Sequence, residues 1–544
     1  MIIPISQDTN KFYISIAGGD PQVVKKLIYN DSQVQNVVVW ADYYSQYFTI
    51  ESQANENSIS LRIANGITLT SIEKSLDDGV TWTTPSYTGD SSSKTYRLGD
   101  STNNYLNNGE KVLVRIVANN LSTGYAATRS YFIFSKNVKV YGNIMSLLYG
   151  ADFEGQDTLS TTSCLQDIFK NCTTLTDISN LKLPATTLSN YCYGGMFSGC
   201  TSLGGLLPEL PATTLATGCY SEMFKGCTSL KKGLELKALN LAQNCYSGMF
   251  ATCTSLVEAP ILPATTLATS CYSSMFANCT SLVTPPILPA IELANNCYEN
   301  MFVNCTFSVA PELPSLTLKE SCYRAMFQGC TSLTTAPVLY ATTLQKSCYY
   351  EMFRGCTSLT IAPTLPATTL AESCYYVMFY DCTSLTTAPT LPATNLAQGC
   401  YSSMFQGCTS LTTAPNLPAT TLTISCYNNM FNGCTSLSTA PTLPATTLQS
   451  GCYYGMFQGC TSLTTAPILE ATTLVQNCYR QMFDGCSRLN EVTCLATNIS
   501  ASNCLTYWLR NVASSGTFYK DSTMSSWPSG TSGIPTNWTT VNYN

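Results

Sequence analysis

Cysteine is the residue type that offers the most chemistry in this sequence, which contains 28 cysteines and no histidine. The cysteines are strictly spaced: a first cysteine recurs about every 26 residues, and a second follows eight residues later in the first thirteen copies. Thiols in this number can form disulfides, bind zinc or fill a core. The first cysteines are at 164, 192, 219, 245, 271, 297, 322, 348, 374, 400, 426, 452, 478 and 504.

The spacing decides between these three roles. On a helix, two cysteines eight residues apart would lie about 12 Å apart along the axis, which is too far for a disulfide. Equivalent cysteines of neighbouring copies come within reach, but a uniform ladder cannot pair every rung without strain. A zinc site is disfavoured because CxxC pairs and histidines are both missing. We therefore expect buried, reduced cysteines that act as small apolar fillers, and folding in a reducing compartment.

No constellation in the sequence predicts catalysis. Acidic residues are scattered, and the absence of histidine removes the commonest general base and metal ligand. We expect a protein that is not an enzyme, with no catalytic residue, no metal site and no cofactor. The net charge of −6 with no basic run argues against nucleic-acid binding, and no apolar run is long enough for membrane insertion. The start, MIIPISQDTNKFY, does not read as a secretory signal peptide.

The elements that carry the cysteines are contained in one repeat, of which residues 374–399 are a clear copy, CYYVMFYDCTSLTTAPTLPATNLAQG. The pattern CYxxMFxGC predicts an amphipathic helix of about two turns, with the glycine as its C-cap. SLTTAPxLP reads as a strand in which Leu385, Thr387, Pro389 and Leu391 point inward. Stacked copies predict a repeat solenoid of 14 coils over residues 164–510, with a short helix and a parallel strand per coil. Because each strand contains proline, we expect a narrow sheet.

The flanking segments differ from the repeat. Short apolar runs, VVVW at 37–40 and YFTI at 47–50, predict β-rich structure in an attachment or capping segment. Alternating runs separated by turn residues then predict a β-sandwich-like domain, in which SLDDGVTW matches the Asp-box hairpin turn. The tail after the last cysteine predicts a closing hairpin that caps the open end. The predicted parts are 1–60, 61–142, a lead-in at 143–163, the repeats at 164–510 and a cap at 511–544.

Two sets of variable positions are candidate ligand-binding residues. The first is a column on the strand, which we expect to be exposed: Val338, Thr364, Thr390, Asn416, Thr442 and Ile468. The second lies on the outer face of CYxxMFxGC: Arg324, Tyr350, Glu351, Tyr376, Asn428, Tyr454 and Arg480. Tyrosines at 350, 376 and 454 could stack on sugar rings. The alternative is that all these positions are simply solvated.

At CTSL…LP…CYxxMFxGC the chain resembles the BspA-like leucine-rich repeats of bacterial surface proteins, with MF in place of AF. The resemblance covers roughly residues 160–510. The NIMSLLYG lead-in and GTSGIP…W ending resemble a version found in gut Bacteroidetes and their phages. The resemblance implies adhesion and recognition.

From these features we expect a non-enzymatic phage virion protein, a fibre or spike component at the virion surface after assembly in the host cytoplasm. Its N-terminal region would bind other virion proteins, and its repeats would bind a host cell-surface glycan or protein. A homo-oligomer is possible. The missing signal peptide and the many unpaired thiols favour this interpretation. The alternative is a bacterial cell-surface or secreted BspA-like adhesin.

Overall fold

The computed structural model describes residues 13–14, 22–23, 47–90, 93–122 and 129–543. Contacts divide the chain into two units: residues 1–158, 174–185 and 205–211 form the first, and residues 159–173, 186–204 and 212–544 form the second. The VVVW run and most of the predicted segment 1–60 lie outside the described residues. The domain boundaries drawn from the sequence stay predictions.

The first unit is β-rich, as predicted, and its described core consists of two sheets of mainly antiparallel strands. One sheet has the order β10-β4-β7-β6 with β8 beside β4, and the other β12-β11-β3-β9-β5 with β13 beside β11. Apolar residues such as Ile59, Leu61 and Val114 are fully buried. The strands are β1 Tyr13–Ile14, β2 Gln22–Val23, β3 Phe48–Ser52, β4 Asn57–Ala64, β5 Leu69–Ser75, β6 Tyr87–Asp90, β7 Ser93–Arg97, β8 Tyr105–Leu106, β9 Lys111–Ala118, β10 Tyr131–Phe134, β11 Val138–Asn143, β12 Leu175–Asp177 and β13 Leu181–Lys182.

The Asp-box turn forms as the motif predicts. Ser75 Oγ donates to Asp77 Oδ1 at 2.7 Å and accepts from the Gly79 N–H at 2.8 Å. Gly79 has φ +87°, a conformation that glycine adopts without strain. The Trp82 indole lies against the Arg115 guanidinium, 4.0 Å from the ring centroid. The motif therefore shapes a hairpin turn.

The chain then changes from antiparallel to parallel pairing. After β11, a short helix α1 (Ser146–Tyr149) and a 3-10 turn η3 (Gly150–Asp152) follow. Strands β12 (Leu175–Asp177) and β13 (Leu181–Lys182) return to pair with β11 in parallel. Among the described residues, helix is limited to α1 and η3, and neither is long and apolar enough to cross a membrane.

The predicted helix at CYxxMFxGC is wrong. In each copy, which we call a coil, this segment is a run of turns with positive φ at every fourth residue, for example Ser373, Val377 and Asp381. Its N–H groups alternate between two partners. Tyr376 donates within its coil to Ser373 O at 3.2 Å, whereas Val377 donates to Ser402 O of the next coil at 2.9 Å. In an α-helix, all of these N–H groups would bond within the same coil. Here the N–H groups alternate between their own coil and the next one, so main-chain bonds between coils replace the helix.

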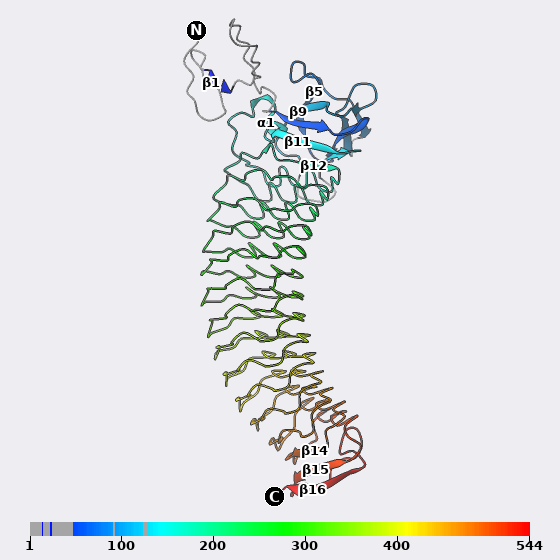
Figure 1. Ribbon diagram of the computed structural model, residues 1–544, viewed down its shortest axis with the longest axis vertical. Helices are drawn as coiled ribbons and strands as arrows, with labels where there is room; N and C mark the ends of the chain where they lie inside the picture. Colours follow the sequence, from blue (N-terminus) through cyan, green and yellow to red (C-terminus); the bar gives the residue numbers. More distant parts are fainter. Residues whose placement is uncertain (1–12, 15–21, 24–46, 91–92, 123–128, 544) are drawn as a thin grey trace, which may run out of the picture. The chain divides into compact units, whose positions relative to one another are not determined.

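Inside the second unit, side chains repeat as ladders along the stack visible in Figure 1. Tyr349 and Tyr375 stack with ring centroids 5.8 Å apart, and Phe353 and Phe379 at 5.6 Å. The cysteine, tyrosine, methionine and phenylalanine of CYxxMF are buried in coil after coil. The positions that stay constant in sequence are therefore the ones that pack against the same residue of the next coil.

The strand segment contributes single parallel bridges in place of continuous strands. Ile361 bridges Thr387, and Thr387 bridges Thr413, each 26 residues further on. This agrees with the narrow sheet expected from the prolines. Leu385, Pro389 and Leu391 are buried as predicted, but Thr387 is exposed. The inward alternation therefore fails at Thr387, where the backbone forms an isolated bridge and not a regular pleated strand.

The C-terminal end is a parallel sheet and not the predicted hairpin. Strands β14 (Glu491–Cys494), β15 (Gly516–Asp521) and β16 (Trp538–Tyr543) pair in parallel in this order. Trp508 continues the tyrosine ladder, with its centroid 6.4 Å from that of Tyr479, and its Nε1–H donates to Gly533 O at 2.9 Å. The tail thus extends the stacking of the repeats because its strands follow the same parallel direction.

Candidate functional site

The thiols are buried and free, as the sequence predicted. Burial raises the pKa of the Cys374 thiol to about 12 and of the Cys426 thiol to about 11, so they stay protonated at neutral pH. The described residues contain no group of three or more His, Cys, Asp or Glu side chains that could hold a metal ion. These thiols are therefore poor nucleophiles and poor ligands.

The second cysteine of each coil has a further role that the sequence did not reveal. Its Sγ donates to the main-chain oxygen of the phenylalanine in the preceding coil, at 3.1 Å from Cys382 to Phe353 and 3.0 Å from Cys408 to Phe379. The same bond recurs along the stack, from Cys200–Phe169 to Cys486–Phe457. Cysteine therefore links successive coils as well as filling space.

The predicted strand column is exposed, as expected. Val338 and Ile468 are 52% and 41% exposed, so this column offers apolar as well as hydroxyl and amide groups. Thr364, Thr390, Asn416 and Thr442 are exposed too. The neighbouring leucines, such as Leu339 and Leu391, are buried. Binding of a ligand by this column stays a prediction.

The second predicted set contains a row that we call the outer row, formed by the residues two positions after the first cysteine of seven consecutive coils. The structure brings three of its members into one stack. The Arg324 guanidinium lies 4.9 Å from the centroid of the Tyr350 ring, and the Tyr350 and Tyr376 rings stack at 4.9 Å and 17°. Glu299 anchors Arg324 by an ion pair of 3.4 Å. The outer row is Arg324, Tyr350, Tyr376, Ser402, Asn428, Tyr454 and Arg480.

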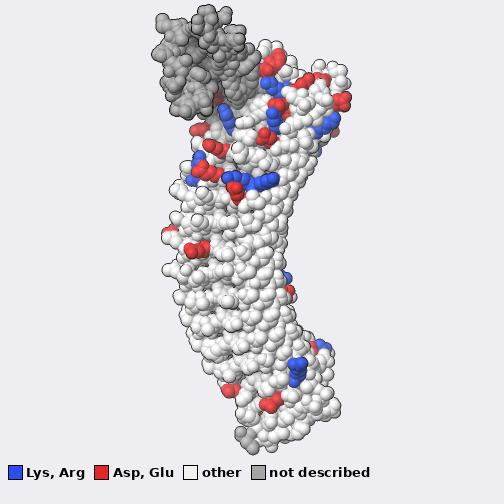
Figure 2. Space-filling model, in the orientation of Figure 1, with Lys and Arg blue, Asp and Glu red and all other residues white. Residues whose placement is uncertain are grey.

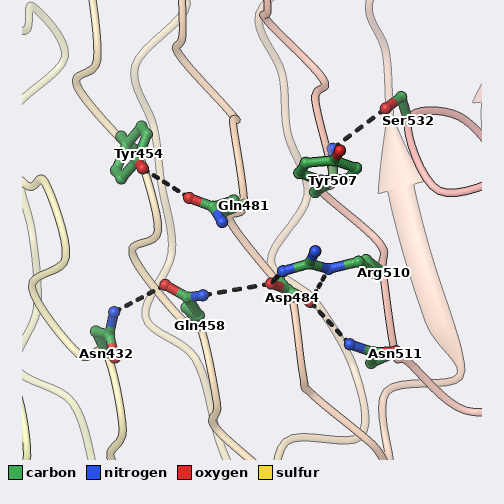
Figure 3. Close-up of polar contacts among 9 residues, drawn as sticks. All are labelled: Asn432, Tyr454, Gln458, Gln481, Asp484, Tyr507, Arg510, Asn511 and Ser532. Atoms are coloured by element: carbon green, nitrogen blue, oxygen red, sulfur yellow. Dashed lines mark hydrogen bonds and ion pairs between the residues drawn. The ribbon is translucent and has the colours of Figure 1, made fainter.

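Two more of the predicted residues in the outer row, Tyr454 and Arg480, form a separate pair. The Arg480 guanidinium lies 5.6 Å from the centroid of the Tyr454 ring. The Tyr454 hydroxyl donates to Gln481 Oε1 of the next coil at 2.6 Å, as Figure 3 shows. Sequence reasoning missed Gln481 and Glu299, which fix these groups. Gln481 directly follows Arg480, and Glu299 stands two residues after Cys297, which is the position of Arg324 one coil earlier, so these two positions were open to inspection in the sequence.

A neighbouring row is a structural ladder. Asn432 Nδ2 donates to Gln458 Oε1 at 2.9 Å, and Gln458 Nε2 donates to Asp484 Oδ2 at 3.3 Å (Figure 3). Asp484 is buried and accepts from Arg510 Nε at 3.0 Å and Asn511 Nδ2 at 3.3 Å. Because these side chains satisfy one another, this row stabilises the coils and leaves little polar capacity for a ligand.

Charge is sparse along the stacked coils. Figure 2 shows long stretches of the visible face of these coils with neither acidic nor basic side chains. Residues 382–469 contain no Asp, Glu, Lys or Arg at all. A ligand held by the middle of the outer row would therefore meet neutral polar groups and aromatic rings.

Stacked coils with buried leucines, joined by parallel bridges, define a leucine-rich repeat protein. The chain belongs to the family described as the BspA type leucine rich repeat region, which matches residues 159–307, 321–442 and 401–508. The resemblance inferred from CTSL…CYxxMFxGC is thereby confirmed.

Two solved structures are similar to this chain. A leucine-rich repeat protein from Bacteroides ovatus ATCC 8483 is 20% identical, with a TM-score of 0.33, over 60% of this chain and 86% of that chain. A TLR13–ssRNA13 complex is 12% identical, with a TM-score of 0.23, over 64% of this chain and 53% of that chain. No curated protein matches the sequence.

Proposed function

We propose that this protein is a non-enzymatic recognition protein of the adhesin type, displayed at a bacterial cell surface or released from the cell. One observation carries the proposal: the side chains that vary between coils lie outside, whereas those that stay constant are buried. Tyr350 and Tyr376 are partly exposed, while Tyr349 and Tyr375, the preceding residue in each coil, are buried. Such a frame presents different side chains on a constant backbone.

Two further points support this proposal. Family membership favours it, because BspA-like repeats resemble those of surface proteins implicated in adhesion. The chain also has no histidine, and burial raises the pKa of thiols such as Cys374 to about 12, so the commonest general base and an activated thiol nucleophile are both missing from the support for an enzyme. Its partner would be a glycan or protein of the host or of another cell.

Cell fractionation and binding test this function together. Fluorescently labelled full-length protein should bind host epithelial cells or bacteria of the source community, saturably, and unlabelled protein should displace it. Peptide mass spectrometry should find the protein enriched in washed cell envelopes or culture medium. The absence of saturable binding to both cell types would overturn the proposal.

The second candidate function is a phage virion appendage, whose N-terminal region binds other virion proteins. Its specific support is the set of 28 free, buried thiols, which suits folding in a reducing cytoplasm. Enrichment in purified particles, at a fixed ratio to the major capsid protein, would favour this function over the cell-surface adhesin. Deletion of residues 1–60 should then abolish incorporation into particles. Sedimentation of the purified protein tests whether it forms a homo-oligomer.

A further inference from the structure

Two tyrosines of the outer row each have one ring face covered and one left open. Tyr376 is covered by Tyr350 of the preceding coil, at 4.9 Å and 17°. Because the two rings are nearly parallel and stack along the coil axis, the second face of Tyr376 is directed toward the next coil, which carries Ser402. Among the described residues, no other ring or cation covers Tyr376.

Tyr454 is covered from the opposite direction. Arg480 lies over its ring from the following coil, so its second face is directed back toward Asn428. The two open faces are therefore directed toward one another along the same row. Between them lie only Ser402 and Asn428 of that row, in two intervening coils.

Both rings are held in place before any ligand binds. Tyr376 is fixed through Tyr350 by Arg324, which Glu299 holds in an ion pair. Tyr454 is fixed at its hydroxyl by Gln481, at 2.6 Å (Figure 3). Rings that are already ordered lose little conformational entropy on binding, and this favours affinity.

The distance between the Tyr376 and Tyr454 rings suits a ligand that consists of more than one ring. On the adjacent buried tyrosine ladder, the three coil steps measure 5.7, 5.9 and 5.9 Å. A stacked contact between carbon atoms needs about 3.5–4 Å on each side, so a short chain of rings fits between them.

The floor of the interval is small, polar and neutral. Ser402 is buried, at 5% exposed, and its hydroxyl donates to Asn428 O at 3.3 Å, so its short side chain does not project between the two rings. Asn428 Oδ1 accepts from Asn429 Nδ2 at 2.7 Å. In the described part of the chain, Asn428 Nδ2 has no partner and is free to donate to a ligand. The surrounding residues 382–469 carry no charge.

Sugar rings match these features, because their C–H faces pack on aromatic faces and their hydroxyls hydrogen-bond to amides. We propose that Tyr376 and Tyr454 are the two end walls of a binding site for a neutral oligosaccharide, which lies over Ser402 and Asn428. Tyr350 and Arg480 are positioning residues behind these walls. This inference rests on the proposed recognition function and names its ligand class.

Affinity electrophoresis of the full-length protein tests the site. Native gels would contain soluble starch, a mixed-linkage β-glucan, galactomannan or arabinoxylan as neutral probes, and polygalacturonate as an acidic probe. At least one neutral polymer should retard the protein, and polygalacturonate should not. Retardation by none of the neutral polymers, or by polygalacturonate alone, would overturn the inference.

Variants then locate the site. Tyr376→Ala and Tyr454→Ala should each weaken binding of the retarding polymer at least tenfold. Tyr340→Ala is the matched control, because Tyr340 is 51% exposed but lies outside the outer row. Thermal unfolding of every variant should match the parent. Wild-type affinity in both tyrosine variants, or an equal loss in Tyr340→Ala, would overturn the site.

The outcome also separates this site from the proposed function. Polymer binding that persists unchanged in both tyrosine variants, while the parent binds cells, would remove the oligosaccharide site and leave the adhesin function intact. A parent protein that binds no cells would overturn the function even if a polymer retards it in the gel.

Discussion

Cys382 Sγ donates a hydrogen bond to the main-chain oxygen of Phe353, one coil earlier, at 3.1 Å. That oxygen also accepts from the Cys356 N–H at 3.0 Å, within its own coil. A single carbonyl therefore serves both the turn that shapes a coil and the thiol that attaches the next one. Alanine could fill much of the same space but could not make this bond.

Replacing this thiol should cost more than replacing the other cysteine of the same coil. Cys374 and Cys382 are both fully buried, but in the described structure Cys374 makes no such bond. We expect Cys382→Ala to lower the free energy of unfolding more than Cys374→Ala does, by about 0.5–1 kcal/mol. Urea titrations of the two variants measure the difference, and equal losses would show that the thiol acts by volume alone.

Thiol labelling should report folding. Native protein at pH 7.5 should react only slowly with iodoacetamide, because burial protects the thiols and holds the pKa of Cys374 at about 12. After denaturation without a reductant, mass spectrometry should count 28 alkylated cysteines. Disulfide-linked peptide pairs in the non-reduced digest would contradict the free-thiol structure.

Alkaline pH should destabilise the fold. An unfolded thiol ionises near its ordinary pKa of 9.0, whereas burial raises the pKa of Cys426 to about 11 in the folded chain. Below pH 9 both states hold the proton, and stability is unaffected. Above pH 9 the unfolded state loses its proton first, so each buried thiol reduces stability by up to about 1.4 kcal/mol per pH unit until its folded pKa is reached. The urea midpoint should therefore be lower at pH 10.5 than at pH 8, and equal midpoints would contradict this prediction.

Backbone strain can be tested at one turn position. Gly399 has φ +59°, and a methyl group added there would meet Ser373 Oγ at 3.5 Å, an ordinary contact. Gly399→Ala should therefore cost about 1–2 kcal/mol from the backbone alone. Gly399→Asn should cost less, because Asn296 and Asn477 adopt the same conformation at equivalent positions. Thermal melts of the two variants provide the test, and an asparagine variant less stable than the alanine variant would contradict this account.

The period, the burial of the cysteines and the exposure of the Val338–Ile468 column follow from the sequence, because each depends only on which positions are apolar. The turns did not. In the nine-residue pattern CYxxMFxGC, apolar residues point inward with a period of four. The α-helix has a period of 3.6 residues, and over only nine residues the two periods cannot be distinguished. Two positions could have indicated turns: the residue before each first cysteine and the residue three positions after it, for example Ser373 and Val377 around Cys374. These positions are rich in glycine, asparagine and serine, which tolerate positive φ.

The parallel C-terminal sheet and the paired tyrosines were beyond sequence reasoning for a different reason. Gly516–Asp521 and Trp538–Tyr543 look equally suited to a hairpin, and only the direction of the coil before them sets a parallel order. Likewise, the contact of Arg324 with Tyr350 depends on the lateral register of two coils. The constant spacing of the cysteines indicates that coils align but does not give side-chain orientation.

Main-chain bonds between coils have a consequence for how this protein changes over generations. Because each coil is attached to the next through backbone groups such as Val377 N–H and Ser402 O, a duplicated or deleted 26-residue unit finds the same partners on both sides. Recombination between near-identical repeats in the gene can therefore lengthen or shorten the outer row in a single event. The exposed surface can then diverge by point substitutions at the outer positions, because their side chains do not contribute to the buried ladders or to the main-chain bonds between coils.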